Sequence, residues 1–367
     1  MFTLLIISAT IYAARLAFFL IGQARPTQQR VVWKNVPFVS IIVPARNEEA
    51  NLERCLTALC ASEYPADKYE ILVVNDRSDD ATEQVLQELS ARLPRVRPLH
   101  RRDTLDHPNL KGKPGALQHG IDNAKGSVYV LTDADCLVHP LWLDTMVAPF
   151  ADDTVSLVCG FTVIRLRRLF DILQDIEWLY TQTMARAGIQ NGVPLGCFGN
   201  NMAIRAETYQ ELGGYSAIEF SITEDLALLQ AMSKAGKGVR YLCDERATVE
   251  TLPCVTVGEY LRQKHRWVRG GMALGSKAVA FVISGATYWV GLVASILNHE
   301  WFWAGGFLLL RIVGDGLLIT TSVARLRRWK VFPAVAPSIV ALLLLELLLP
   351  FMTLRKRIVW KNQVFRQ

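Results

Sequence analysis

Two kinds of hydrophobic pattern divide the chain. Residues 3–22, 278–297, 301–323 and 331–354 are almost continuously apolar, and each approaches the ~20 residues that a helix needs to cross a bilayer. Residues 37–270 instead carry short apolar runs that alternate with segments of helical spacing. This alternation is typical of an α/β unit with a mostly parallel sheet.

These patterns predict four regions. We expect an N-terminal transmembrane anchor (1–24), an α/β domain large enough for a catalytic site (37–270), C-terminal transmembrane or re-entrant helices (274–354) and a basic tail (355–367). No convincing small-residue cleavage site follows the first segment, so we expect it to remain uncleaved. A full crossing by the fourth segment would place the basic tail outside, against the positive-inside rule. That segment therefore either spans, re-enters or lies along the interface.

Within the α/β domain, buried strands are predicted at 38–45, 69–76 and 127–135. Helices are predicted at 47–62 with Asn47 as N-cap, at 78–93 opened by Ser78 or Asp79, and at 115–125. A longer helix is predicted at 165–188, with Leu169, Ile172, Leu173, Ile176 and Leu179 on one side. That side either packs in the core or lines a membrane-facing entrance for an acceptor.

Charge and cysteine content favour a membrane protein facing a reducing compartment. The net charge of +6 is concentrated beside the apolar segments, in Arg25–Arg30, Arg262–Arg269, Arg325–Lys330 and Arg355–Lys361, as expected next to an anionic lipid surface rather than a nucleic acid. The seven cysteines form no C-x-x-C and are expected to be free thiols. We therefore expect a multi-pass protein of the cell (inner) membrane with a cytoplasmic catalytic domain.

Charged residues inside the apolar segments are expensive in lipid and are expected to pair. Arg311 and Asp315 are four residues apart on one predicted helix, so they share a face. Arg15 and Glu346 are the other two such residues, and we expect them to lie near each other.

Polar residues follow three predicted strands at one edge of the sheet. Asn47 and Glu48 follow the first strand, Asp76 ends the second, and Asp133 and Asp135 end a later one. In parallel sheets ligands gather outside the carboxyl ends of the strands. Two aspartates one residue apart suit a hard divalent cation that carries a phosphate, and a strand-end turn is the alternative.

Five motifs occur in a fixed order: VSIIVPARNEE (39–49), ILVVNDRSDD (71–80), KGKPGALQHGI (111–121) with the D-x-D after it, FSITEDLALLQ (220–230) and QKHRW (263–267). On these motifs, residues 37–270 resemble the family 2 inverting glycosyltransferases. The resemblance implies a GT-A (Rossmann-like) nucleotide-sugar domain of α/β class with a mostly parallel sheet, here flanked by transmembrane helices.

The resemblance also implies roles for single residues. Asp135 would bind Mg²⁺ or Mn²⁺ directly, and Asp133 would hold the ribose or a metal-bound water. Asp76 would accept a hydrogen bond from the nucleotide base, and Lys113 and Arg266 would bind the diphosphate. The remaining donor-side candidates are Pro44, Asn47 and Glu48.

On the acceptor side, Asp225 of TED would be the general base, with Glu224 as the second acid and Thr223 as a candidate cap for the helix that follows. Acids in the first turn of an ordinary helix are the alternative. Gln263 and Trp267 match Q-x-x-R-W, where Trp267 could stack on the acceptor. A basic interfacial helix is the other interpretation of this segment. Asn200 and Asn201 are further candidate contacts.

These features predict a hexosyltransferase that moves one sugar from a nucleotide donor, most simply a UDP-sugar, to the hydroxyl of a membrane lipid. Ceramide, diacylglycerol, polyprenyl-phosphate, hopanoid and carotenoid acceptors remain open. The first alternative is a processive polysaccharide synthase. Such an enzyme needs a channel to secrete its polymer, and three or four membrane segments leave little material to build one. The second is a non-catalytic nucleotide-sugar-binding scaffold. Such a protein should have lost acids at the metal or base positions, whereas Asp76, Asp133, Asp135 and Asp225 are all present here.

Overall fold

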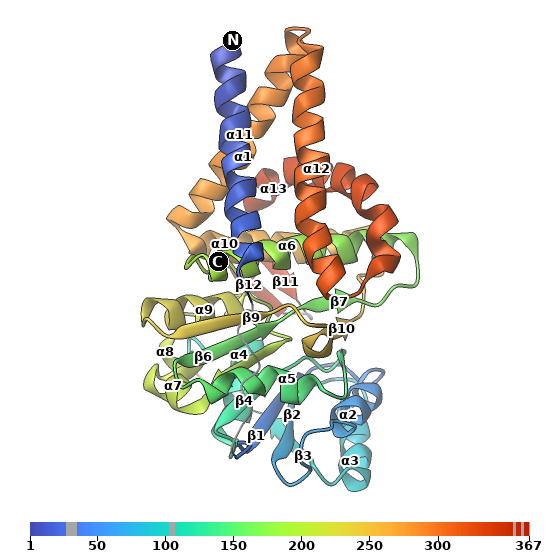
Figure 1. Cartoon of the computed structure of the whole chain (residues 1–367). Helices are drawn as coiled ribbons and strands as arrows, with labels where there is room; N and C mark the ends of the chain where they lie inside the picture. The colour runs from blue at the N-terminus through green and yellow to red at the C-terminus, as the bar shows by residue number, and fades with distance from the viewer. Residues whose placement is uncertain (27–34, 103–106, 355–356, 361–362, 367) are drawn as a thin grey trace.

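The computed structural model describes residues 1–26, 35–102, 107–354, 357–360 and 363–366. Arg30, Arg355, Lys356 and Lys361 of the basic runs lie outside this described part. An α/β domain occupies one end of the molecule, and long apolar helices extend from the other end (Figure 1). Two helices, α6 (Leu169–Gln190) and α10 (Val257–Gly271), lie between them.

A seven-stranded sheet forms the centre of the α/β domain, in the order β3-β2-β1-β4-β8-β6-β9. Its strands are β1 (Val39–Ala45), β2 (Tyr69–Asp76), β3 (Val96–Arg101), β4 (Val128–Leu131), β6 (Val155–Gly160), β8 (Met202–Arg205) and β9 (Gly238–Leu242). Only β8 runs antiparallel to its neighbours, while β1, β2, β3 and β4 are parallel to one another and β9 is parallel to β6. The predicted mostly parallel sheet is confirmed.

Shorter elements complete the domain. The helices are α2 (Leu52–Cys60), α3 (Thr82–Arg92), α4 (Lys113–Asp122), α5 (Trp142–Val147), α7 (Ala206–Glu211), α8 (Gly214–Ala217) and α9 (Glu224–Lys234), with 3₁₀ turns η1 (Ala148–Ala151), η2 (Glu245–Ala247) and η3 (Met272–Leu274). A second sheet contains β5 (Leu137–Val138), β10 (Val249–Thr251) and β7 (Thr162–Ile164), and β11 (Arg357–Trp360) pairs with β12 (Gln363–Arg366). The predicted apolar face of α2 is confirmed, because Leu52, Leu56 and Leu59 are buried.

Two predicted helix starts are wrong. α2 begins at Leu52, and Asn47 precedes it with a positive φ of 55°. The Asn47 amide donates to Ser78 Oγ, and its side chain accepts from the Asp79 amide. Ser78 and Asp79 therefore join the loops after β1 and β2, and α3 begins only at Thr82. Polar side chains that resemble helix caps here satisfy backbone groups of a neighbouring loop.

The expected apolar face of α6 is wrong at its start, where Leu169 is 86% exposed. The helix is instead buried on several sides from Gln174 onward, and its buried residues include charged ones such as Asp175 and Arg186. Asp175 pairs with Arg328 at 2.9 Å, and Arg186 donates to Gln23 Oε1 at 2.8 Å. α6 is therefore a central helix that binds the α/β domain to the apolar helices.

In the described part of the chain, four helices are long and apolar enough to cross a membrane: α1 (Phe2–Ala24), α11 (Ser276–Leu297), α12 (Trp301–Arg325) and α13 (Val335–Thr353) with its preceding 3₁₀ turn η4 (Trp329–Ala334). The predicted ion pair on α12 is confirmed, with Arg311 Nε 2.7 Å from Asp315 Oδ2. Glu346 pairs with Arg311 at 2.6 Å rather than with Arg15. Arg15 instead packs over the Phe281 ring and donates to the Tyr180 hydroxyl.

The helix α13 differs from the other three apolar helices in its placement. Whereas α1, α11 and α12 rise away from the α/β domain, α13 stays beside α6 and α10 (Figure 1). Before its start, Arg328 binds Asp175 of α6. At its end, the Thr353 carbonyl accepts from Arg269 of α10 at 3.1 Å. Both ends of this segment are therefore attached to helices of the catalytic region.

Candidate active site

A polar cavity of about 280 Å³ lies where the parallel strands end. The end of β1 contributes Pro44, the loop after it Glu48, β2 contributes Asp76, and the turn after β4 contributes Asp133 and Asp135. Parallel pairing of β1 with β2 and with β4 brings these segments to one edge of the sheet. Of the polar residues expected at this edge, Glu48, Asp76, Asp133 and Asp135 line the cavity and Asn47 does not.

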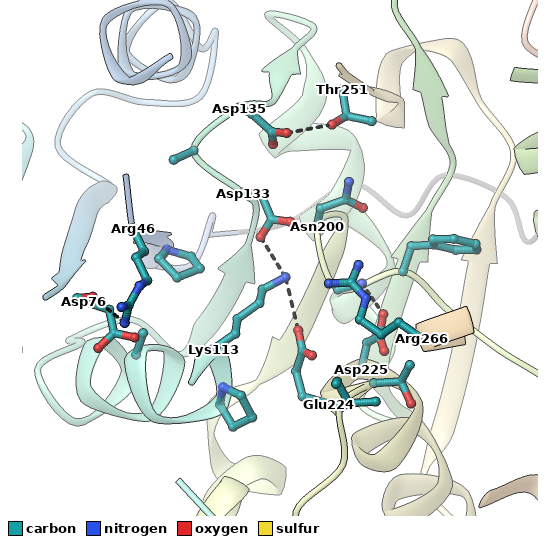
Figure 2. Close-up of a pocket in the computed structure, with 18 of the residues that line it drawn as sticks. Arg46, Asp76, Lys113, Asp133, Asp135, Asn200, Glu224, Asp225, Thr251 and Arg266 are labelled. Carbon is teal, nitrogen blue, oxygen red and sulfur yellow. Dashed lines mark hydrogen bonds and ion pairs between the residues drawn. The ribbon is translucent and has the colours of Figure 1, made fainter. Parts of the chain in front are cut away.

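Lys113 joins the two acidic motifs inside this cavity. Its ammonium lies 2.7 Å from Asp133 Oδ1 and 3.1 Å from Glu224 Oε1, and Figure 2 shows it pointing between the two carboxylates. Burial alone would lower the pKa of Lys113, but the charges of Asp133 and Glu224 outweigh this effect and raise it. Lys113 is therefore a fixed cation that links the D-x-D to the TED motif.

The D-x-D residues have the chemistry of a cation site that substrate must complete. Asp135 Oδ2 accepts from Thr251 Oγ1 at 3.2 Å, and the two aspartates face the same cavity (Figure 2). Among the described residues, no group of three His, Cys, Asp or Glu side chains could hold a metal ion. Mg²⁺ typically binds through one or two carboxylates plus phosphate oxygens and water. Asp133 and Asp135 fit a divalent cation shared with a diphosphate.

Asp76 is held by two arginines. Its Oδ1 lies 3.0 Å from Arg77 Nε and 3.1 Å from Arg101 Nη1, and its side chain is almost fully buried. Arg77 occupies the left-handed region with φ of 55°, so the loop after β2 is tightly turned. These contacts fix the Asp76 carboxylate at the margin of the cavity, next to Arg46 (Figure 2).

Asp225 stands at the start of α9 with both oxygens fixed. Oδ2 accepts from the Gly199 amide at 2.7 Å, and Oδ1 accepts from the Leu226 amide at 2.8 Å. Burial, and next the charge of Glu224, raise its pKa to about 6 against the opposing effect of Lys113. A carboxylate with this pKa suits a general base near neutral pH. Thr223 is the N-cap residue of α9, but its hydroxyl contacts Ser221 and makes no capping bond.

The helix α10 brings the Q-x-x-R-W residues to the same cavity. Its N-terminus is stabilised by a capping box between Thr256 and Glu259. Gln263, Arg266 and Trp267 all line the cavity. The Trp267 ring lies 5.0 Å from that of Trp178 and 5.3 Å from that of Phe198, measured between centroids.

A second cavity, of about 370 Å³ and mostly apolar, lies between the α/β domain and the membrane helices. Residues of α1, α6, α10, α11, α12 and α13 line it, including Arg15, Phe281, Arg311, Leu342 and Glu346. The two cavities share Phe198, Thr223, Asp225 and Trp267. Asp225 therefore lies in the wall of both the polar and the apolar cavity.

Most predicted site residues line the polar cavity, but Asn47 and Asn201 do not. Asn200 is in its wall, and Asn200 Oδ1 accepts from Thr162 Oγ1. Asn201 is fully buried, and its amide nitrogen donates to two backbone carbonyls. Asn47 lies in the loop contacts described above rather than in the cavity wall.

Several residues of the cavity wall were not indicated by the sequence, among them Arg46, Trp178, Phe198 and Thr251. Arg46 directly follows Pro44 and Ala45 at the end of β1, so a strand-end argument could have included it. Trp178 lies inside a helix whose pattern resembles ordinary packing. No local signal marks Thr251, because it reaches Asp135 through the small second sheet.

The family model for glycosyl transferase family 21 matches residues 1–367. The chain belongs to glycosyl transferase family 21. The matching model names this family and not family 2, which the motifs resemble. Family membership is therefore established for the whole chain.

Curated relatives match about two thirds of the chain. The probable glycosyltransferase YdaM of Bacillus subtilis (strain 168) is 30% identical over 252 residues, covering 67% of this chain and 58% of YdaM. The beta-monoglucosyldiacylglycerol synthase of Nostoc sp. (strain PCC 7120) is 28% identical over 257 residues, covering 68% of this chain and 52% of the synthase. The chain thus spans just over half the length of these two relatives.

A solved structure matches almost the whole molecule. The mannosyltransferase PcManGT from Pyrobaculum calidifontis, in complex with GDP-Man and Mn²⁺, has a TM-score of 0.59 and 20% sequence identity. The match covers 93% of this chain and 99% of that protein. At this identity the likeness concerns the fold, including the apolar helices beside the GT-A-like domain.

Proposed function

We propose that this protein transfers a single sugar from a nucleotide-sugar donor, a UDP-sugar, to the hydroxyl of a membrane lipid with inversion at the anomeric carbon. The observation that carries the proposal is the position of Asp225 in the wall of both cavities. The polar cavity has the charges that a nucleotide diphosphate needs, and the apolar cavity suits the hydrocarbon part of a lipid. A relative that is a beta-monoglucosyldiacylglycerol synthase supports a lipid acceptor.

The reaction follows from the roles of five side chains. The lipid hydroxyl gives its proton to Asp225 as its oxygen forms a bond to the anomeric carbon. The bond from that carbon to the diphosphate breaks, and the nucleotide diphosphate leaves with the electron pair. Lys113 and Arg266 hold the departing phosphates. A divalent cation bound by Asp133 and Asp135 would neutralise part of the diphosphate charge.

Inversion is proposed from the arrangement of the two cavities. The D-x-D residues line only the polar cavity, and Asp225 is reached from the apolar one as well. An acceptor that enters from the apolar side attacks opposite the diphosphate, and one such displacement inverts the configuration.

The test is a transfer assay with the purified full-length protein in lipid vesicles. Labelled UDP-sugars and GDP-mannose are supplied as donors, and the vesicles contain diacylglycerol, ceramide or polyprenyl phosphate. We expect one glycolipid carrying a single sugar from a UDP-sugar. A ladder of polymers would instead support a processive synthase, in line with a relative that is a poly-beta-1,6-N-acetyl-D-glucosamine synthase.

The matched variant is Asp225→Asn, which keeps the shape of the side chain and removes the proton acceptor. Transfer should fall ~10²-fold or more, the usual scale for losing an acid–base group. UDP affinity, measured by calorimetry, should remain. Asp76→Ala is expected to lose UDP affinity. If Asp225→Asn loses it as well, then Asp225 belongs to the nucleotide site and the assignment is wrong.

A further inference from the structure

A buried ion pair between α6 and α10 has no role in the chemistry described so far. The ammonium of Lys264 is in direct contact with Glu177 Oε2, and the two side chains are 3% and 8% exposed. Lys264 is the first x of the Q-x-x-R-W motif, between Gln263 and Arg266. Burying two charges is costly even when they are paired, so the position of this pair calls for a reason other than stability.

The ammonium also contacts the aromatic residues around it. Lys264 Nζ lies 3.8 Å from the centroid of the Trp267 ring and 4.8 Å from that of Tyr260. A cation at this distance from an indole face is attracted by the ring, and most strongly where water is excluded. Glu177 holds the cation, and the cation in turn holds Trp267.

The orientation of Trp267 matters because this ring belongs to the wall between the two cavities. Trp267 and Phe198 line both cavities, and Trp178 lines the polar one. The three rings contact one another with centroids between 5.0 and 5.3 Å apart. A small rotation of Trp267 would change the space next to Asp225, which lies in the same wall.

We propose that Lys264 and Glu177 are positioning residues that orient Trp267 for approach of the acceptor hydroxyl to Asp225. The identity of the acceptor rests on the proposed function, whereas the orientation of the ring does not. The pair should therefore affect acceptor use and leave nucleotide binding unchanged, because its contacts are on the acceptor side of Arg266.

The variants Lys264→Met and Glu177→Gln remove one charge each and keep the size of the side chain. The control is Asp175→Asn, which breaks the other buried ion pair of α6, between Asp175 and Arg328. Asp175 is close to Glu177 in sequence, but it accepts from Arg328, just before η4, and from the Ile164 amide of β7. Where a single variant fails to fold, the double variant K264M/E177L keeps the site filled with apolar groups, which buried pairs often tolerate.

We expect kcat/KM for the lipid acceptor to fall about tenfold or more in both variants, as for loss of a desolvated cation–π contact. UDP affinity should be unchanged, and Lys264→Arg should recover part of the loss. Asp175→Asn should lower thermal stability without this change in acceptor kinetics. If the three variants lose acceptor turnover in proportion to their stability, the pair is merely structural and the proposal is overturned.

A spectroscopic measurement separates this proposal from the proposed function. The fluorescence of Trp267 is obtained by subtracting the spectrum of Trp267→Phe in each background. It should change in Lys264→Met and Glu177→Gln and not in Asp175→Asn. If the wild type transfers no sugar to lipid, the proposed function fails, and this difference alone decides whether the pair positions Trp267. An unchanged spectrum in Lys264→Met would overturn the positioning.

Discussion

At the scale of single residues, Asp225 makes the pH dependence of the reaction predictable. Its pKa is raised to about 6, chiefly by burial and next by Glu224. A general base works only when it is deprotonated, so transfer should fall as the pH drops through about 6 and reach a plateau above it. The measurement is kcat/KM for the acceptor between pH 5 and 8, a range set around the value near 6.

Two variants should move this acid limb in opposite directions. Glu224→Gln removes a charge that raises the pKa of Asp225, so the limb should shift to lower pH. Lys113→Met removes a charge that lowers this pKa, so the limb should shift to higher pH. An acid limb that stays in place in both variants would mean that another group titrates.

The D-x-D motif predicts dependence on a divalent cation. Asp135→Ala should abolish transfer and the cation-dependent part of UDP affinity, because the diphosphate then loses a shared ion. EDTA should have the same effect on the wild type, and added Mn²⁺ or Mg²⁺ should reverse it. Asp67→Asn, which removes the charge of an exposed acid, is the control. Full activity of the wild type in EDTA would contradict this prediction.

At the scale of elements, the sequence located β1 and β2 well, extended β4 beyond its end at Leu131, and predicted helix starts poorly. Apolar runs such as 69–76 become strands because few other structures bury every residue of so short a segment. Asn47 and Ser78 resemble helix caps in the local sequence. In the structure they hydrogen-bond to each other and join the loops after the parallel strands β1 and β2. A local pattern cannot reveal such long-range partners, and the same holds for Trp178 in the cavity wall.

The contact between α1 and α6 depends on one glycine. A Cβ atom on Gly22 would lie 2.5 Å from the Ala187 carbonyl oxygen, in the backbone of α6. Gly22→Val should therefore destabilise the folded protein by about 1–3 kcal/mol, as overpacking usually does. Thermal unfolding in detergent measures this effect.

The matched control for Gly22→Val is Gly305→Val on α12, where a Cβ would meet nothing within 4 Å. It makes the same change within another apolar helix but without the clash. Equal unfolding midpoints for the two variants would show that α1 does not pack closely on α6.

At the scale of the whole molecule, the placement of α13 favours one answer to the topology question that the sequence left open. Both ends of this segment contact helices of the catalytic region, through Arg328 and Thr353. We therefore predict three full crossings, by α1, α11 and α12, with the C-terminus on the side of the catalytic domain. Reporters fused to the two termini of the protein in intact cells should be accessible from opposite sides. Accessibility from the same side would contradict this topology.

The α/β domain could be predicted from sequence because several of its motifs lie at strand ends, where the parallel topology brings them together. The apolar cavity could not be predicted, since it is assembled from seven helices that range from α1 to α13. Hydropathy identifies Arg15 and Glu346 as unusual, but only the packing assigns Glu346 to Arg311 and places Arg15 over Phe281.

The apolar cavity lies beside the last part of α1 and the first part of α11, which are the parts nearest the catalytic domain. A lipid that reaches Asp225 through it would come from the leaflet that faces the catalytic domain. The glycolipid would return to the same leaflet, because moving the polar sugar through the hydrocarbon layer is costly. Its display on the opposite surface would then require a separate flippase, and the supply of acceptor would be limited by the composition of one leaflet.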